Sequence, residues 1–288
     1  MIFTTGLSRP EGPVVMPDGS WLVVEMGPDR GCVTQISRDG KTKRVVAKTG
    51  RPNGLAVDRN GVIWAAESIN PPSLLRMTLD GQFEVFLKEC DGQPFLFPND
   101  LAFGPDGALY MTDSGYPYAE WAKHRAEYKT IKTDGRLYRI DTKTRQIAKL
   151  DSGFLFTNGI AFGPDKACYV NESITGNVHR YKWAGGRVSG VRELFANVVD
   201  SKGPDVYKGP DGMKFGADGN LYVTVFGQGD VTILNPKGAV VKRIPLEGKS
   251  PTNVAFGLPG DRRIYVTEQA IGQLEVYEVE TEGLPLYR

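Results

Sequence analysis

Residues 98–113 read Pro-Asn-Asp-Leu-Ala-Phe-Gly-Pro-Asp-Gly-Ala-Leu-Tyr-Met-Thr-Asp, and this stretch predicts a β-hairpin. A short apolar run at 101–103 is followed by a Gly-Pro-Asp-Gly turn, and a second run occupies 109–112. Short apolar runs separated by a turn rich in Gly, Pro and Asp are typical of two antiparallel strands. The stretch matters because the chain repeats it.

The same pattern occurs six times, and each copy begins with a polar residue. These residues, which we call the repeat heads, are Glu11, Asn53, Asn99, Asn158, Asp211 and Thr252. They follow one another at intervals of about 40 to 60 residues, the period of propeller blades rather than of helical repeats. The copies continue into further strand-like runs joined by turns such as Asp-Gly. Four antiparallel strands in each of six copies predict an all-β fold, a six-bladed β-propeller in a single domain of residues 1–288.

The two ends of the chain predict how the ring closes. The last copy has no convincing fourth strand in residues 281–288, whereas residues 2–7 resemble the fourth strands of other copies. We therefore expect the N-terminal strand to pair with the last blade, which would remove two exposed sheet edges. The alternative is that the first six residues form a loose tail.

Residues 116–134 interrupt the repeat between the second and third strands of the third copy. Residues 119–129 are good helix formers. Trp121, His124 or Arg125, and Tyr128 would share one face of such a helix. We expect a short helical flap beside the mouth of the propeller.

The composition excludes several classes of function. The chain has 35 Lys plus Arg against 34 Asp plus Glu and no basic run, so we expect no nucleic-acid partner. It has no apolar stretch of about 18 residues, so we expect no membrane span, and its first residues do not resemble a signal peptide. Its three cysteines, Cys32, Cys90 and Cys168, do not form a disulfide framework. These features predict a cytoplasmic protein, and no feature indicates its oligomeric state.

The repeat heads predict a metal site. The innermost strand of each blade lines the central tunnel, so the six heads should converge near the axis. They offer two carboxylates, three amides and a hydroxyl, an oxygen-rich set that suits calcium. Two carboxylates would balance a 2+ charge, and zinc is less favoured because the ring has no His or Cys. The alternative is that Asn and Asp only suit a strand-entry turn, which accounts for Asn53 but poorly for Glu11.

A second set of acids lies 14 residues after four of the heads. It consists of Glu25, Glu67, Asp113 and Glu172. The second strand of each hairpin returns to the same face, so these acids should ring the mouth. We interpret most of them as hydrogen-bonded or solvated turn acids. Asp113 is followed by the flap, and we place it closest to a substrate.

Four segments together resemble a known family. They are Glu11-Gly-Pro, Asn99-Asp100, Asn158-Gly159 and Pro210-Asp211-Gly212-Met213. Their order and spacing resemble the SMP-30/gluconolactonase/luciferin-regenerating-enzyme family over nearly the whole chain. The resemblance implies a six-bladed propeller with a divalent metal, often calcium, in the tunnel. It implies Glu11, Asn158 and Asp211 as metal ligands and Asn99 as a fourth ligand or a substrate contact. It also implies Asp211 as the catalytic base or nucleophile.

One departure from the family concerns the substrate. Sugar-lactone hydrolases of this family have an Arg two residues before the position of Asn99, and this chain has Phe97 there. Aromatic residues of the flap could join it, so we expect an apolar or aromatic pocket. The substrate contacts that we predict are Phe97, Asn99, Asp113, Tyr116, Trp121 and His124.

We therefore predict a metal-dependent hydrolase that opens a small lactone or related ester, less polar than a sugar lactone. Calcium is the expected metal, with zinc, manganese and magnesium as alternatives. Asp211 and Asn99 are the predicted catalytic residues. A Ser-His-Asp hydrolase is not supported, because neither His124 nor His179 has a nucleophile motif near it. The alternatives are an organophosphate hydrolase, a small-metabolite isomerase or hydratase on the same metal, and a non-catalytic ligand-binding propeller with a structural metal.

Overall fold

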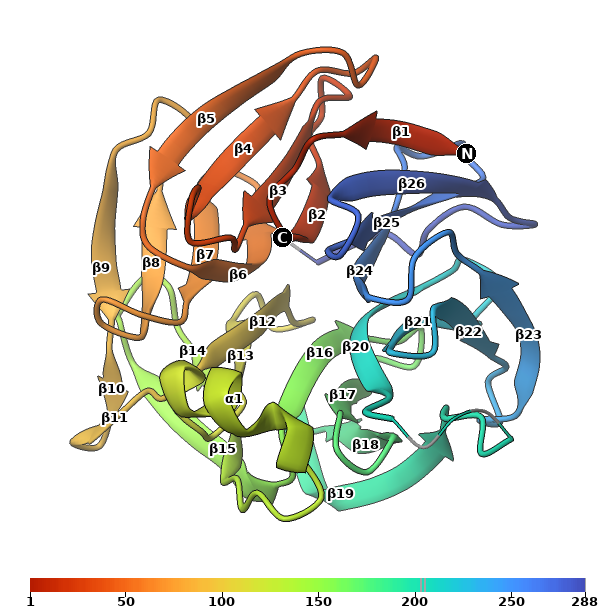
Figure 1. Cartoon of the computed structure of the whole chain (residues 1–288). Helices are drawn as coiled ribbons and strands as arrows, with labels where there is room; N and C mark the ends of the chain where they lie inside the picture. Colours follow the sequence, from red (N-terminus) through yellow and green to blue (C-terminus); the bar gives the residue numbers. More distant parts are fainter. Residues whose placement is uncertain (203, 205, 288) are drawn as a thin grey trace.

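The computed structural model describes residues 1–202, 204 and 206–287. Within these residues, six four-stranded antiparallel sheets are arranged radially around a central axis (Figure 1). The predicted six-bladed β-propeller is confirmed. The hairpin predicted at residues 98–113 is also confirmed, with Leu101 opposite Met111 and Phe103 opposite Leu109.

The strands of the first three blades follow in chain order from the axis outward. Blade 1 comprises β2 (Pro10–Val15), β3 (Trp21–Glu25), β4 (Cys32–Ile36) and β5 (Lys43–Lys48). Blade 2 comprises β6 (Pro52–Val57), β7 (Ile63–Glu67), β8 (Ser73–Met77) and β9 (Phe83–Leu87). A two-stranded hairpin, β10 (Glu89–Cys90) and β11 (Gln93–Pro94), follows it. Blade 3 comprises β12 (Pro98–Phe103), β13 (Leu109–Asp113), β14 (Gly135–Ile140) and β15 (Ile147–Phe154).

The last three blades follow the same plan, except that the outer strand of blade 6 comes from the N-terminus. Blade 4 comprises β16 (Thr157–Phe162), β17 (Cys168–Glu172), β18 (Asn177–Ala184) and β19 (Arg187–Asn197). Blade 5 comprises β20 (Gly209–Phe215), β21 (Leu221–Phe226), β22 (Asp230–Leu234) and β23 (Val240–Pro245). Blade 6 comprises β24 (Pro251–Phe256), β25 (Arg263–Glu268), β26 (Gln273–Glu278) and β1 (Ile2–Thr5).

The N-terminal strand closes the ring, as the sequence predicts. Ile2 pairs with Glu275 and Thr5 with Gln273, and the backbone N–H of Leu7 donates to the carbonyl of Gly272 at 2.9 Å. The alternative of a loose N-terminal tail therefore does not hold. The flap lies between β13 and β14 and contains α1 (Tyr118–His124) and a short 3₁₀ helix, η1 (Arg125–Glu127). Figure 1 shows it over blade 3 on one face of the ring.

Each inner strand begins with a local irregularity that positions its repeat head. Five of the six heads follow a proline. Each inner strand is the edge strand of its sheet, so one side of its backbone has no partner strand and the missing N–H of proline is tolerated there. The pairing register of every inner strand then shifts close to the head, for example between Pro98 and Leu101. Such bulges redirect side chains at strand ends. Here they place the six heads at one end of the tunnel.

The position after each head shows how closely the inner strands approach one another. Four of the six residues there are glycines: Gly12, Gly54, Gly159 and Gly212. A Cβ on Gly159 would lie 2.2 Å from the carbonyl oxygen of Asp211, and one on Gly212 would lie 2.0 Å from the Asn253 side chain. The tunnel is therefore tightly packed directly beneath the heads.

The hydrophobic core lies between neighbouring blades. Leu22 and Val33 of blade 1, for example, pack in one buried cluster with Leu55, Ile63 and Leu75 of blade 2. Each such side chain stabilises the fold by about 1.5 to 3 kcal/mol. The three cysteines are free and buried. No helix in the described part of the chain has the length and hydropathy needed to cross a membrane.

Candidate metal and substrate site

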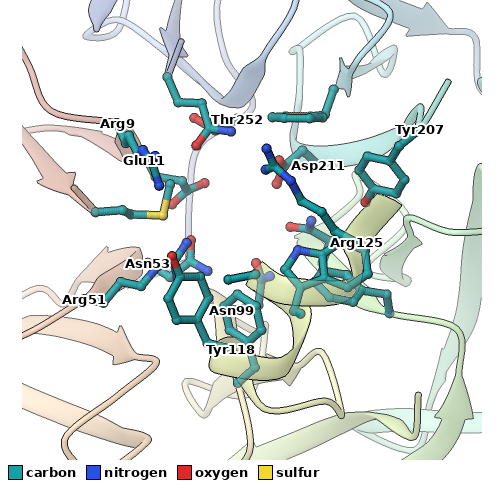
Figure 2. Close-up of a pocket in the computed structure, with 18 residues that line it drawn as sticks. Arg9, Glu11, Arg51, Asn53, Asn99, Tyr118, Arg125, Tyr207, Asp211 and Thr252 are labelled. Carbon is teal, nitrogen blue, oxygen red and sulfur yellow. The ribbon is translucent and has the colours of Figure 1, made fainter. Parts of the chain in front are cut away.

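All six repeat heads line one cavity of about 340 Å³ at the mouth of the tunnel. Figure 2 shows Glu11, Asn53, Asn99, Asp211 and Thr252 converging from different blades, and Asn158 belongs to the same lining. The convergence expected from the repeat is therefore present. The cavity also contains residues that the sequence analysis did not identify.

The carboxylates of the site are crowded. Glu11 is 2% exposed and Asp100, which follows the head Asn99, is also 2% exposed. Burial, followed by the negative charges of Asp100 and Asp211, raises the pKa of Glu11 well above its usual value. Burial and the charge of Asp100 do the same to the pKa of Asp211. The three acids therefore repel one another in a poorly solvated place, an arrangement that a bound cation would stabilise.

The charges indicate how much positive charge the site could take. Lys214 lowers the pKa values of Glu11 and Asp100 through its charge, so it lies within range of this group. The Arg51 guanidinium likewise lowers the pKa of Asp211. Three carboxylates, one ammonium and one guanidinium sum to a charge of −1, so a bound divalent cation would bring this group to +1. Asp100 itself points away from the cavity, because its oxygens accept from the backbone N–H groups of Leu101 at 2.9 Å and Ile160 at 3.3 Å.

The oxygen atoms that face the cavity form the right kind of donor set. Glu11 accepts from the Asn253 amide at 2.7 Å through one oxygen, and its other oxygen, Oε2, is buried without a hydrogen bond. No three His, Cys, Asp or Glu side chains gather as a metal-binding group among the residues that the structure describes. The predicted set instead combines the carboxylates of Glu11 and Asp211 with the amide oxygens of Asn99 and Asn158. Carboxylate and amide oxygens are the ligands that calcium prefers.

Two serines fix the direction of these amides. The hydroxyl of Ser173 donates to the carbonyl of Pro210 at 2.7 Å, so it can only accept from Asn158, whose Nδ2 lies 3.1 Å away. Asn99 is held in the same way, with Nδ2 3.0 Å from Ser114. Because the Nδ2 atom of each amide donates to a serine, its Oδ1 atom is the one that faces the cavity. Such outer contacts are what orient metal ligands.

Asp113 does not reach the cavity. It is fully buried, and its carboxylate accepts from the backbone N–H groups of Leu96 at 2.8 Å, Phe97 at 3.0 Å and Gly115 at 2.8 Å. It therefore holds the loop that carries Phe97 rather than contacting a substrate. The other acids of this set also accept hydrogen bonds from backbone N–H groups of loops; Glu172, for example, accepts from the N–H of Leu155 at 2.6 Å. The interpretation of these residues as turn acids fits these contacts.

The flap and its neighbours form an aromatic wall. We use the name aromatic wall for six residues that all line the cavity: Phe97, Tyr118, Trp121, Phe156, Tyr207 and Phe226. The rings of Trp121 and Phe156 are tilted with centroids 4.2 Å apart, and those of Trp121 and Tyr207 are 5.6 Å apart. Phe97 and Trp121 thus lie where the sequence analysis placed them. Tyr207, from the segment before β20, was not identified.

The other two predicted flap contacts lie elsewhere. Tyr116 packs behind the wall against its buried cluster and is not part of the lining. His124 is exposed, with Nε2 3.6 Å from Glu120 of the same helix, and it also lies outside the lining. Arg125 lines the cavity in its place, together with Arg9 and Arg51. The sequence analysis assigned no function to Arg9 or Arg51.

The chain resembles known proteins in sequence. A sequence model described as the SMP-30/gluconolactonase/LRE-like region matches residues 10–270. A gluconolactonase of Zymomonas mobilis is 26% identical over 276 residues, which cover 90% of this chain and 76% of that protein. A 6-deoxy-6-sulfogluconolactonase of Pseudomonas putida is 32% identical over 188 residues, which cover 64% of this chain and 62% of that protein.

The solved structures that resemble this chain agree on the fold. The calcium-binding protein regucalcin of Agrobacterium tumefaciens superposes with a TM-score of 0.77 at 22% identity, covering 100% of this chain and 99% of that one. At that identity the likeness shows the propeller alone. Some sequence relatives are longer proteins, since the chain spans 49% of the strictosidine synthase-like protein 6 of Arabidopsis thaliana, to which it is 28% identical over 67% of its own length.

Proposed function

The chain belongs to the SMP-30/gluconolactonase/LRE-like family, and from this premise we propose that it is a metal-dependent hydrolase that opens a lactone or a related ester. The observation that carries the proposal is the arrangement of Glu11 and Asp211 with two oriented amide oxygens at the floor of an aromatic-walled cavity. The lactonase names of the sequence relatives support the type of reaction.

Four residues would hold the metal: Glu11, Asn158, Asp211 and Asn99. Calcium suits this oxygen-only set best, and zinc, manganese and magnesium are the alternatives. A divalent cation bound there would supply Lewis-acid polarisation of the substrate carbonyl. Asn99 would be either a ligand or a hydrogen-bond acceptor for the substrate, because its amide nitrogen is already bound to Ser114.

Asp211 is the residue that would move the proton. Its carboxylate takes a proton from the attacking water, whose oxygen bonds to the carbonyl carbon. The ring C–O bond then breaks, the leaving oxygen takes up the proton that Asp211 holds, and the new carboxyl group releases its own proton. The sum is one lactone plus one water giving one hydroxy carboxylate and one proton. The aromatic wall would hold an apolar part of the substrate and exclude water, which is why we propose a substrate less polar than a sugar lactone.

A hydrolysis screen tests this proposal. Metal-stripped protein would be assayed with a pH indicator on sugar lactones, aliphatic and aromatic lactones and aryl phosphotriesters, after separate addition of calcium, manganese, zinc or magnesium. We expect metal-dependent turnover that is fastest on apolar lactones. Tight metal binding without turnover on any substrate class would refute the hydrolase proposal. We also keep the cytoplasmic location as a prediction, which cell fractionation would check.

The substitution Asp211→Asn separates the two roles of Asp211. At saturating calcium we expect hydrolysis to fall by about 10²- to 10⁴-fold, the usual contribution of a general base. The matched control is Asp39→Asn, because Asp39 is an exposed turn acid whose replacement should leave the rate unchanged. If Asp211→Asn lost calcium binding and folding together, a purely structural ion would be the better interpretation.

A further inference from the structure

The position two residues before each repeat head differs in character around the ring. The six residues are Arg9, Arg51, Phe97, Phe156, Gly209 and Ser250. Blades 1 and 2 thus carry cations there, blades 3 and 4 carry aromatic rings, and blades 5 and 6 carry small residues. The first four line the cavity. Figure 2 shows Arg9 and Arg51 on the same side of it, with Arg125 across from them.

Arg51 lines the cavity beside the flap, with an aromatic ring close to its guanidinium and one N–H group that no protein acceptor satisfies. Its guanidinium lies 3.7 Å from the ring centroid of Tyr118 and 5.2 Å from that of Phe97. One terminal nitrogen, Nη1, donates to the hydroxyl of Ser68 at 3.2 Å. Its Nε is buried without a hydrogen-bond acceptor. Because the N–H groups of a guanidinium lie in its plane, a group that satisfies them must approach along the edge, as a two-oxygen anion does.

No carboxylate of the protein fills that role for Arg51. Among residues 1–202, 204 and 206–287, no ion pair within 4.0 Å involves Arg51, Arg9 or Arg125. The charge of Arg51 lowers the pKa of Asp211. Burial lowers the pKa of Arg51 itself, whereas Tyr118, through a hydrogen bond, and then the charge of Glu67 raise it. The Oε1 atom of Glu67, however, accepts from the backbone N–H groups of Arg51 at 2.7 Å and Ile69 at 3.0 Å.

Arg9 adds a second cation at the same rim. Its backbone adopts φ +50°, a left-handed conformation that non-glycine residues seldom adopt. The conformation is held from below, because the carbonyl of Arg9 accepts from the N–H of Met26 at 3.1 Å and Glu25 accepts from the N–H of Ser8 at 2.7 Å. Asp29 is fully exposed, and its pKa is lowered first by a hydrogen bond from the hydroxyl of Ser8 and only last by the charge of Arg9.

We infer that the substrate, whose lactone part is less polar than a sugar lactone, also carries an anionic group, and that Arg51, assisted by Arg9, binds this group. The inference rests on the proposed function, because with a divalent cation at the floor the acids there are neutralised and the arginines leave the mouth positive. The anion is a carboxylate, sulfonate or phosphate, which share the planar or forked oxygens that match a guanidinium. The lactone carbonyl would then face the metal site at the floor of the cavity, and the apolar part of the substrate would lie against the aromatic wall.

The test uses two substrates that differ in charge. One is a γ-butyrolactone with a 4-carboxyphenyl substituent, and the other is its 4-carboxamidophenyl counterpart. We expect Arg51→Gln to lower kcat/KM for the carboxylate by about 10- to 100-fold, the range for a charged hydrogen-bonded contact, and for the amide by less than about threefold. An equal loss on both substrates would mean that Arg51 only packs against the flap, and the inference would fail.

Two further variants guard against misfolding. Arg9→Gln alters an exposed side chain, so it should fold normally and lower the preference for the carboxylate by about three- to tenfold. The control is Arg187→Gln, at an exposed position in the outer strand β19, which should change neither rate. If Arg51→Gln and Arg9→Gln both kept the wild-type preference for the carboxylate over the amide, the inference would be overturned. Sulfonate and phosphate versions of the lactone would then show which anion is preferred in the wild type.

A binding measurement separates this inference from the proposed hydrolysis. Calcium-loaded protein would be titrated calorimetrically with the carboxyphenyl lactam and with its carboxamide, neither of which needs to be hydrolysed. We expect about tenfold tighter binding of the anionic lactam, and we expect Arg51→Gln to abolish this difference. If no lactone were hydrolysed but this preference were present, the proposed reaction would fail and the anion site would stand. Equal binding of the two lactams would overturn the anion site.

Discussion

Removal of the Ser173 hydroxyl would test how the metal site is oriented. Ser173 is 1% exposed, and its hydroxyl joins the Asn158 amide to the carbonyl of Pro210. In Ser173→Ala the amide loses the contact that distinguishes its nitrogen from its oxygen. The two orientations about its last torsion then become closer in energy, so Oδ1 no longer faces the cavity in every molecule.

The expected magnitude follows from these contacts. Loss of an outer contact to a metal ligand lowers metal affinity by about 10- to 100-fold, or about 1.4 to 2.7 kcal/mol. The carbonyl of Pro210 also loses its donor, and a buried polar group left without a partner costs about 1 to 3 kcal/mol of folding free energy. We therefore expect weaker calcium binding together with a moderate loss of stability.

Calcium titration by calorimetry and urea unfolding of the calcium-free protein would measure the two effects separately. Ser68→Ala is the matched control, because Ser68 also lies 15 residues after its repeat head, is buried and donates to a proline carbonyl, that of Pro98. Its hydroxyl accepts from Arg51, however, and not from an amide of the predicted ligand set. Ser68→Ala should lose some stability and leave the calcium affinity unchanged. Ser114→Ala would show whether Asn99 is a ligand. Wild-type calcium affinity in Ser173→Ala, with lowered stability, would refute the proposed role of Asn158.

Two other predictions concern the frame around the site. Burial raises the pKa of Glu172, but hydrogen bonds from His179 at 3.0 Å, Thr175 at 2.6 Å and the N–H of Leu155 at 2.6 Å outweigh it and set this pKa below the usual 4.5. A carboxyl with a lowered folded-state pKa stabilises the fold above pH 4.5 and loses this contribution as the pH falls through the folded value. Glu172→Gln should therefore cost about 1.5 to 3 kcal/mol at pH 7 by urea unfolding, and the difference from wild type should shrink on acidification; a constant difference at all pH values would contradict this. Gly212→Ala should destabilise the fold by about 1 to 3 kcal/mol or more and weaken calcium binding, because the new Cβ would lie 2.0 Å from the Asn253 side chain that holds Glu11. A melting temperature equal to that of the wild type would show that the inner strands can move apart.

The sequence predicts the parts of this protein that depend on repeated local patterns. Hairpins of fixed length return in register, so the blades, the ring closure and the converging heads follow from the chain alone. The two flap residues illustrate where such reasoning ends. A regular helix leaves His124 and Arg125 equally eligible for the inner face, but α1 ends at His124 and continues as the 3₁₀ helix η1. The tighter turn changes which side chain lines the cavity.

Other site residues were hidden because their role depends on tertiary contacts. Asp113 is the last residue of a buried strand, as expected of a residue at the mouth, and only the folded loop shows that its carboxylate accepts from three backbone N–H groups. Tyr207 comes from an irregular segment without a pattern of its own. Arg9 and Arg51, in contrast, could have been found by comparing the position two residues before every head.

The departures from the repeat are what make a ring of six similar blades into a specific site. A symmetrical ring offers the same group from every direction and cannot orient an asymmetric substrate. Asp100 shows how one departure depends on another, since it occupies a position that is glycine in four of the other five blades. It fits because its neighbour in blade 2 is Gly54, on which a Cβ would lie 2.6 Å from the Asp100 carboxylate. The glycine and the acid therefore form a pair, and any change at Gly54 should disturb the charge balance beneath Glu11 and Asp211.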